Sequence, residues 1–287
     1  MARAAITPLD WTGGPALAWV LCAALLYWLG GRATSPRPGQ GWRTAAFLGG
    51  LLTILVAVDS PLDDLADRAF WAHMSQHLLL ITVAPPLLAL ARPWNRMWRG
   101  LPLELRRPFA HELVQGRAWA PLRATVRFLV RPLPSWLLFN VTFIAWHLPV
   151  LYEAGLTSEP IHALEHLTFF ATALLFWTRV IDSPPWRSPL SEPGKLAYLA
   201  STLIVGWILA IVLAMATSAL YPAYADEASR PLQLSALTDQ QLAAGIMWVP
   251  GSIAYTIAIV LVAYRMLEPR SARGNGRPAS ALPTGVG

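Results

Sequence analysis

The sequence predicts an all-α, polytopic membrane protein, and three observations predict it: composition, the length of the apolar runs and the placement of charge. Of the 287 residues, 55% are hydrophobic and only 13% are charged, and the mean hydropathy is +0.45. Soluble domains carry roughly twice that share of charged residues, about 25%. The charged residues also fall in gaps between long apolar runs. This pattern is typical of a bundle of membrane-spanning helices.

Seven apolar runs are long enough to cross the bilayer hydrocarbon, which takes about 17 to 25 helical residues. They cover residues 14–31, 43–60, 70–91, 134–154, 160–181, 196–220 and 241–267. Pro85 and Pro86 lack backbone donors, so we expect the third helix to kink or end near them. Only Arg3 precedes the first run, whereas three arginines follow it, the reverse of a signal peptide, so we expect a retained helix. The runs predict one seven-helix transmembrane domain over residues 14–268.

Charge asymmetry orients this bundle, because short cytoplasmic loops collect Lys and Arg. With residues 1–13 outside, as a periplasmic N-terminus, 19 of the 22 basic residues lie on the inner side. Nine of them fall in residues 92–133, which we expect to form a basic cytoplasmic loop at the membrane interface. Residues 269–287 are rich in Gly, Pro, Ser and Arg and are expected to be a disordered cytoplasmic tail. The net charge of +6 therefore indicates N-out, C-in topology in a lipid bilayer and not nucleic-acid binding.

Five of the six histidines are expected at one depth, roughly 3 to 11 Å below the outer boundary of the membrane. Two pairs have i, i+4 spacing, which places both imidazoles of a pair on one helix face. Imidazoles are uncommon inside bilayers, so this level predicts a ligand set for a metal or a haem. The alternative is interhelical hydrogen bonding. The five are His73, His77, His147, His162 and His166.

Other groups at this level could complete a metal site. Met74 and Met247 add thioethers, and thioether with imidazole suits copper, Cu(I) especially; the alternative for each Met is core filling. Glu165 and Asp59 are candidate carboxylates that would accept a hydrogen bond from a ligating imidazole and orient it, or else pair with Arg68 at the rim. The lone Cys22 excludes a Cys-pair site.

Three further functions fit part of the pattern. A haem-binding electron carrier would use His77 and His166 as axial ligands. A copper transporter would need ligands across the membrane, and the spans hold almost no polar ligand groups below the histidine level. A zinc-dependent hydrolase would use the H-x-x-E-H arrangement of residues 162–166. No nucleophile stands beside a base, so we do not expect an enzyme.

Four stretches of the sequence resemble the CtaG family of cytochrome c oxidase assembly factors, the multi-span kind tied to caa(3)-type oxidase. Residues 70–80 read FWAHMSQHLLL and lead to APPLL, and the others are HLP at 147–149, HALEH at 162–166 and MWVPG at 247–251. The likeness covers roughly residues 45 to 265.

The resemblance implies a seven-helix protein of the bacterial inner membrane that supports maturation of the copper-containing oxidase. The family's histidine motifs match His73, His77, His147, His162 and His166, and Met74 and Met247 lie inside matching stretches. The implied cofactor is copper, as Cu(I) or Cu(II), at a site that faces the periplasm. The implied partners are cytochrome c oxidase subunits and a periplasmic copper donor.

Overall fold

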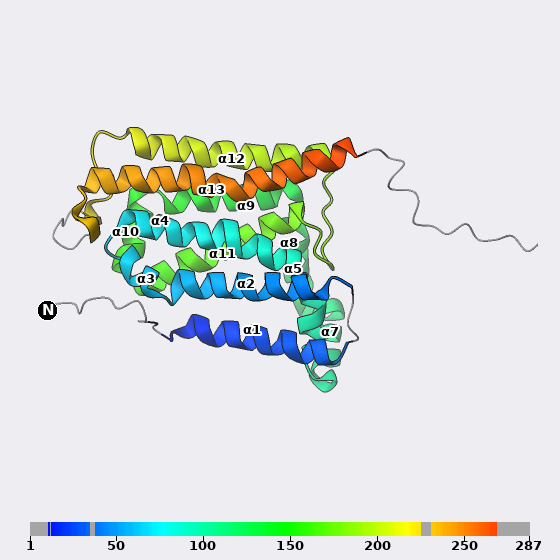
Figure 1. Cartoon of the computed structure of the whole chain (residues 1–287). Helices are drawn as coiled ribbons and strands as arrows, with labels where there is room; N and C mark the ends of the chain where they lie inside the picture. Colours follow the sequence, from blue (N-terminus) through cyan, green and yellow to red (C-terminus); the bar gives the residue numbers. More distant parts are fainter. Residues whose placement is uncertain (1–10, 12, 35–37, 225–230, 269–287) are drawn as a thin grey trace, which may run out of the picture.

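The computed structural model describes residues 11, 13–34, 38–224 and 231–268 of the chain. Within these residues all regular structure is helical, which confirms the all-α class. The long helices lie side by side in one bundle, with the start of α1 and the end of α13 at opposite ends (Figure 1). The expected N-terminal segment 1–13 lies almost wholly outside the described residues, and the expected tail 269–287 lies wholly outside them.

Five segments are long and apolar enough to cross a membrane. They are α1 (Pro15–Arg32), α2 (Gln40–Val58), the segment Phe70–Ala91, α12 (Glu192–Met215) and α13 (Ala236–Leu267). A sixth results if Arg117–Leu129 and Pro132–Trp146, which are bent by 84°, count as one span. The described residues thus give five or six candidate spans where the apolar runs predicted seven. The difference includes α11 (Glu159–Val180), whose mean hydropathy is lowered by His162, Glu165 and His166.

The outer faces of the bundle are apolar, which suits contact with lipid. Exposed apolar side chains follow one face of α13 at helical spacing, at Val249, Ile253, Ile257 and Val260. Large aromatic side chains fill the interior instead, among them Phe139, Phe169, Phe176 and Trp177. Because a monomeric soluble protein rarely leaves long apolar faces open to water, these outer faces indicate contact with hydrocarbon.

The third span is irregular, as its prolines predicted. It consists of α4 (Phe70–Leu78), a π-helical turn η1 (Leu79–Val83) and α5 (Ala84–Ala91). Pro85 has no N–H to donate to the carbonyl of Ile81, four residues earlier. The indole Nε1 of Trp177 on α11 donates to that carbonyl instead, at 2.9 Å. A side chain of another helix therefore satisfies the backbone acceptor that proline leaves open.

The expected continuous helix over residues 134–154 is wrong, because the structure divides it. Helix α9 (Pro132–Trp146) ends before His147, and α10 (Pro149–Thr157) begins two residues later. Leu148 between them is extended, with φ −69° and ψ 130°. The physical reason is Pro149, whose ring disfavours helical backbone at the residue before it.

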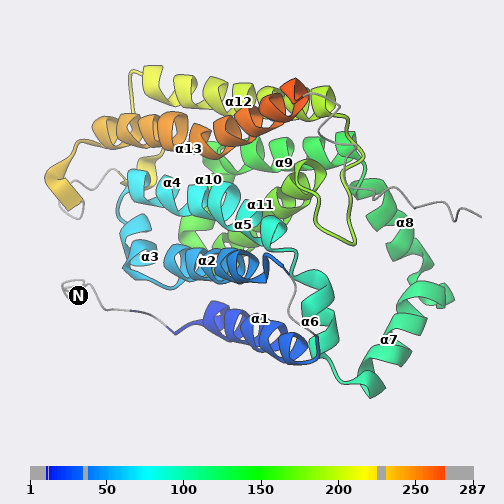
Figure 2. The same ribbon diagram turned by 45° about the vertical axis from the view of Figure 1, so that its right-hand side comes forward.

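Residues 92–133 form short helices across one end of the bundle (Figure 2). They are α6 (Trp94–Gly100), α7 (Leu103–Gln115), the 3-10 turn η2 (Arg117–Trp119) and α8 (Ala120–Leu129). Nine arginines lie in this stretch, so we call this the arginine-rich end. The opposite end carries α3 (Pro61–Ala66), α10 and the short turns η3 (Pro222–Tyr224) and η5 (Pro231–Gln233) (Figure 1).

The short helix α3 is joined to α4 by a buried polar contact. The amide Nε2 of Gln76 donates hydrogen bonds to Asp63 Oδ1 and to the carbonyl of Ala57 at the end of α2. Burial raises the pKa of the Asp63 carboxyl to about 6; the Gln76 hydrogen bond opposes this rise, and the nearby Asp67 and Asp64 add to it. One amide thus holds α2, α3 and α4 together.

Trp177→Phe is expected to destabilise the protein. The substitution leaves the Ile81 carbonyl buried with no donor, which costs about 1–3 kcal/mol. Thermal melting of purified protein in detergent, followed by circular dichroism, measures the change. The matched control is Trp207→Phe, which removes an indole hydrogen bond to Ser252 at an exposed position. Equal melting temperatures for the two variants would contradict this role of Trp177.

Asp63→Asn is expected to raise the melting temperature at pH 7.5 but not at pH 5. The folded-state pKa of about 6 lies above the ordinary value of 3.8, so the folded protein binds more protons between these values and loses stability as pH rises through them. Asparagine keeps an acceptor for Gln76 and carries no charge. Melting curves of variant and wild type at the two pH values test this, with the exposed Asp64→Asn as control. An equal difference in melting temperature between Asp63→Asn and wild type at both pH values would contradict this prediction.

Candidate metal centre

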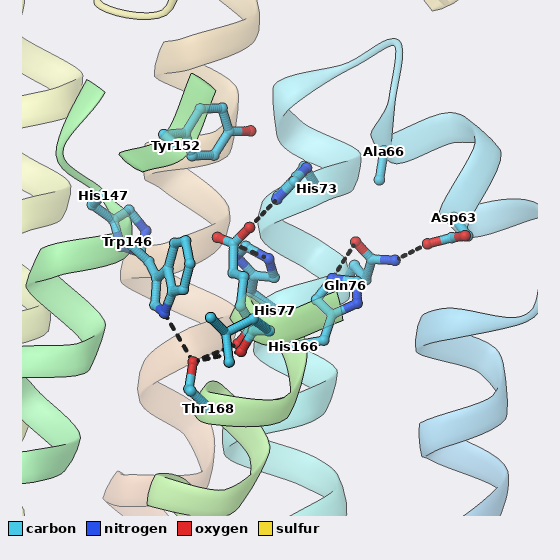
Figure 3. Close-up of polar contacts among 12 residues, drawn as sticks. Asp63, Ala66, His73, Gln76, His77, Trp146, His147, Tyr152, His166 and Thr168 are labelled. Carbon is cyan, nitrogen blue, oxygen red and sulfur yellow. Dashed lines mark hydrogen bonds and ion pairs between the residues drawn. The ribbon is translucent and has the colours of Figure 1, made fainter. Parts of the chain in front are cut away.

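Four candidate ligands from two helices meet inside the bundle. His73 and His77 come from α4, and His162 and Glu165 come from α11. One ligand atom from each of the four lies within 4.8 Å of all the others. We call these four residues the His/Glu cluster. Figure 3 shows His73 and His77 on one face of α4, one helical turn apart.

The distances inside the His/Glu cluster are close to those of a metal site. Glu165 Oε1 lies 3.5 Å from His77 Nε2, and Glu165 Oε2 lies 4.0 Å from His73 Nε2. The ring centroids of His73 and His162 are 5.3 Å apart. Donors that share one tetrahedral ion at bond lengths near 2.0 Å are roughly 3.3 Å apart. The four donors, all within 4.8 Å of one another, are thus at most about 1.5 Å farther apart than donors that share an ion.

Unpaired polar atoms are the strongest feature of this site. Within the described residues, both oxygens of Glu165, both ring nitrogens of His77, and the Nε2 atoms of His73 and His162 are buried without a hydrogen-bond partner. Each such atom costs about 1–3 kcal/mol when it stays unpaired. Buried polar groups in native proteins nearly always have partners, so a concentration of unpaired ones calls for an explanation such as a bound ion.

The hydrogen bonds around His73 direct a lone pair toward the cluster. Tyr224 donates its hydroxyl proton to the carbonyl of Ala66 at 2.9 Å, and its oxygen lies 3.3 Å from His73 Nδ1. This arrangement suits a neutral ring that is protonated on Nδ1. The Nε2 atom of His73 then carries the lone pair and faces Glu165. Such an outer partner fixes both the tautomer and the orientation of a ligating imidazole.

His166 lies next to the His/Glu cluster but has another partner. Its ring centroid is 4.2 Å from that of His162 and 5.5 Å from that of His77. Its Nε2 lies 3.2 Å from the Oε1 of Gln76, whose amide nitrogen is already used by α2 and α3 (Figure 3). His166 Nε2 therefore donates to this oxygen. The His166 ring is therefore oriented by the same Gln76 amide that joins α2, α3 and α4.

His147 lies at the break between α9 and α10. Its Nδ1 is 2.7 Å from the carbonyl of Phe143, so Nδ1 carries the proton and Nε2 carries the lone pair. That Nε2 is buried and has no partner in the described part of the chain. His147 is not among the four residues whose ligand atoms lie within 4.8 Å of one another. It is a nearby imidazole with a free lone pair.

The remaining predicted site residues have other contacts in the structure, and Tyr152, which packs with both methionines, lies 5.0 Å from His73 between ring centroids. Met74 and Met247 pack in a hydrophobic cluster with Phe70 and Tyr152. Asp59 accepts a hydrogen bond from the backbone N–H of Gly14 at 2.8 Å, at the start of α1. Glu165, expected as an outer group, instead presents both oxygens to the imidazoles.

Contacts from other helices keep α4 and α11 in register. Asp239 of α13 accepts from the backbone N–H groups of Phe70 and Trp71, and so caps the first turn of α4. Gly155 of α10 gives room to Glu165, because a Cβ atom at this glycine would lie 2.8 Å from Glu165 Oε2. None of these contacts, nor the roles of Gln76 and Tyr224, could be predicted from the sequence. The only local signal was the position of Gln76 between two histidines.

Comparisons with known proteins agree with the motifs. Residues 25–268 match the family described as cytochrome c oxidase caa3 assembly factor. Uncharacterized proteins of Mycobacterium bovis and Mycobacterium tuberculosis are each 25% identical over 236 residues, which cover 80% of this chain and 35% of theirs. One of Mycobacterium leprae is 23% identical over 230 residues, covering 78% and 34%.

The chain spans about a third of the length of these mycobacterial relatives. No solved structure matches it significantly. The family match includes both i, i+4 histidine pairs and extends over most of the sequence. The chain belongs to the family of cytochrome c oxidase caa3 assembly factors.

Proposed function

We propose that this protein binds a copper ion at the His/Glu cluster and supports the maturation of the metal centres of cytochrome c oxidase. The observation that carries the proposal is the set of buried, unpaired nitrogen and oxygen atoms on His73, His77, His162 and Glu165. The family supplies the oxidase as the enzyme served. The copper ion is the cargo in this proposal and leaves the site when it is transferred to an oxidase subunit.

The donor chemistry supports copper. Three imidazoles and a carboxylate suit copper or zinc over magnesium and calcium, and Cu(II) binds nitrogen and oxygen donors more tightly than other first-row divalent metals do. Met74 and Met247 pack among aromatic side chains, so the cluster itself consists of harder donors than Cu(I) prefers. Zinc is the competing ion, and metal analysis separates the two.

The surroundings of the cluster support exchange of the ion at one end of the bundle. The ring of His162 is partly exposed, whereas His73 and His77 are buried. The acidic helix α3 lies at this end, with Asp63 and Asp64 in its first turn. We take this end as periplasmic and the arginine-rich end as cytoplasmic, with α11 as a seventh span in the bacterial inner membrane. Acidic groups there raise the local concentration of cations and suit docking of a periplasmic copper donor.

The packing of the cluster favours an ion over a haem. A porphyrin between His77 and His166 would need a flat slot, but His77 packs against Phe169 with ring centroids 4.6 Å apart. His166 Nε2 is also engaged with Gln76. Neither of the two cavities described in the structure is lined by a histidine.

The aromatic interior argues against a path for ions across the membrane. Phe169, Phe176 and Trp177 continue along α11 on the side of the cluster away from α3, and all three are fully buried. An ion moving toward the arginine-rich end would meet apolar rings with few donors. Delivery from the end that carries α3 therefore suits the site better than transport, and we propose no catalytic reaction.

Glu165→Gln and His77→Ala are each expected to abolish copper binding. Both changes remove a donor from the cluster, and neither replacement forms a metal ligand of comparable strength. Purified protein loaded with Cu(II) or Zn(II) and dialysed should retain about one copper per chain by elemental analysis. His111→Ala is the matched control, because His111 is exposed on α7 at the other end. Undiminished copper in both cluster variants, or no copper in the wild type, would refute the site.

Glu165→Gln is also expected to lower oxidase activity in cells that depend on this protein, and added copper should restore part of that activity. Copper in excess loads the oxidase through weaker routes when the high-affinity site is lost. Oxygen consumption by washed membranes, with and without copper in the growth medium, measures the effect, and His111→Ala should behave as wild type. Loss of activity that copper never restores would indicate a scaffold instead of copper delivery.

A further inference from the structure

A polar cavity opens at the arginine-rich end of the bundle, far from the His/Glu cluster. It has a volume of about 360 Å³ and is lined by residues that include Tyr27, Gln40, Arg43, Arg92, Arg96 and Arg99. Arg43 lies 14 residues before Ala57 on α2, and Ala57 binds the Gln76 amide beside the cluster. At 1.5 Å per residue the two sites are roughly 20 Å apart along this helix.

Close packing of α1 against α6 builds one wall of the cavity. A Cβ atom on Gly30 would lie 1.8 Å from the carbonyl oxygen of Arg96, and one on Gly100 would lie 2.2 Å from the carbonyl oxygen of Leu26. The helices can therefore approach only because these positions are glycine. Arg96 is fixed in the wall, since its Nε donates to the Tyr27 carbonyl at 2.9 Å and its guanidinium stacks over the Tyr27 ring at 4.1 Å.

The charge of this cavity is unbalanced. Among the described residues no acidic side chain lines it, and none of its four arginines forms an ion pair within 4.0 Å. The Nε of Arg43 is buried and lacks a hydrogen-bond partner in the described part of the chain. A buried guanidinium nitrogen without an acceptor is costly. The cavity thus places four guanidinium groups around one space with no carboxylate among its described lining residues.

The volume and the donors fit a phosphate group. Guanidinium groups bind phosphate oxygens through paired N–H donors. Gln40 and Thr34 also line the cavity, but the Gln40 amide donates to the Tyr27 hydroxyl at 3.0 Å and the Thr34 hydroxyl donates to the Gly30 carbonyl at 3.1 Å, so the guanidinium groups are the main donors left for an anion. The cavity is also within the range of about 300–1,000 Å³ that small-molecule sites occupy.

The position of the cavity favours a membrane lipid as the source of a phosphate group. It lies where α1 ends and α2 begins, and exposed tryptophans flank it at Trp28 and Trp42. Tryptophan gathers at the level of lipid headgroups. Basic pockets between spans at that level bind anionic headgroups. We infer that this cavity binds the phosphate of an anionic phospholipid such as phosphatidylglycerol.

Lipid binding to variants of the full-length protein tests the inference. The triple variant Arg43→Gln, Arg92→Gln, Arg99→Gln removes three donors and keeps Arg96, which holds α1 to α6. The matched control Arg107→Gln, Arg117→Gln, Arg127→Gln removes the same charge from exposed positions at the same end. Native mass spectrometry of protein in detergent measures binding of added dioleoylphosphatidylglycerol, dioleoylphosphatidylcholine or inorganic phosphate.

Wild type and control are expected to bind phosphatidylglycerol equally, and the triple variant at least about tenfold more weakly. Phosphatidylcholine should bind wild type no better than it binds the triple variant. Equal phosphatidylglycerol binding by the triple variant and the control overturns the inference. Inorganic phosphate that binds as tightly as the lipid and displaces it shows a free-anion site, which also overturns the lipid assignment.

Arg43→Gln alone serves if the triple variant does not fold. It removes the guanidinium whose Nε lacks a partner and leaves the α1–α6 contact unchanged. A several-fold loss of phosphatidylglycerol binding relative to Arg107→Gln supports the inference, and no difference refutes it. Copper content is measured in the same samples and should stay unchanged, so this test and that of the metal site can fail separately.

Discussion

The burial of imidazole and carboxylate side chains between α4 and α11 is the constraint on which the rest of this structure depends. An apolar bundle cannot solvate an imidazole or a carboxylate, so each such group needs a partner from a neighbouring helix. Tyr224 meets His73, and Gln76 meets His166. The atoms left over belong to the His/Glu cluster and face one another. What they lack in hydrogen bonds, a metal ion would supply.

The span that carries His73 and His77 is itself irregular, and a side chain of a neighbouring helix stabilises the irregular part. Below His77 the third span passes through a π-helical turn and then two prolines. Trp177 satisfies the carbonyl that Pro85 leaves open, and this tryptophan comes from α11, the helix that also supplies His162 and Glu165. The two ligand-bearing helices are thus joined both at the candidate metal centre and along the membrane interior. A shift of one helix against the other would break both contacts.

The two ends of the bundle suit ligands of opposite charge. The end with α3 combines carboxylates and imidazoles, which attract and bind cations. The arginine-rich end combines guanidinium groups around a cavity, which attracts anions. Between them lies an aromatic interior of Phe139, Phe169, Phe176 and Trp177, which carries no charge. A protein that exchanges a metal at one membrane face and binds an anionic lipid at the other would have this distribution.

The sequence by itself determined the helical class, most of the apolar segments, the irregular third span and the two histidine pairs that each share one helix face. These features depend on local properties: run length, proline chemistry and the i, i+4 spacing that places two side chains on one helix face. The tertiary structure alone decided which imidazoles meet, because that depends on how each helix is rotated about its axis. It brought Glu165 among the imidazoles, engaged His166 with Gln76, turned Asp59 to Gly14 and ended α9 before His147. Rotation and register are set by contacts between residues far apart in the chain, such as Asp239 with Phe70 and Trp71, and sequence periodicity carries no record of them.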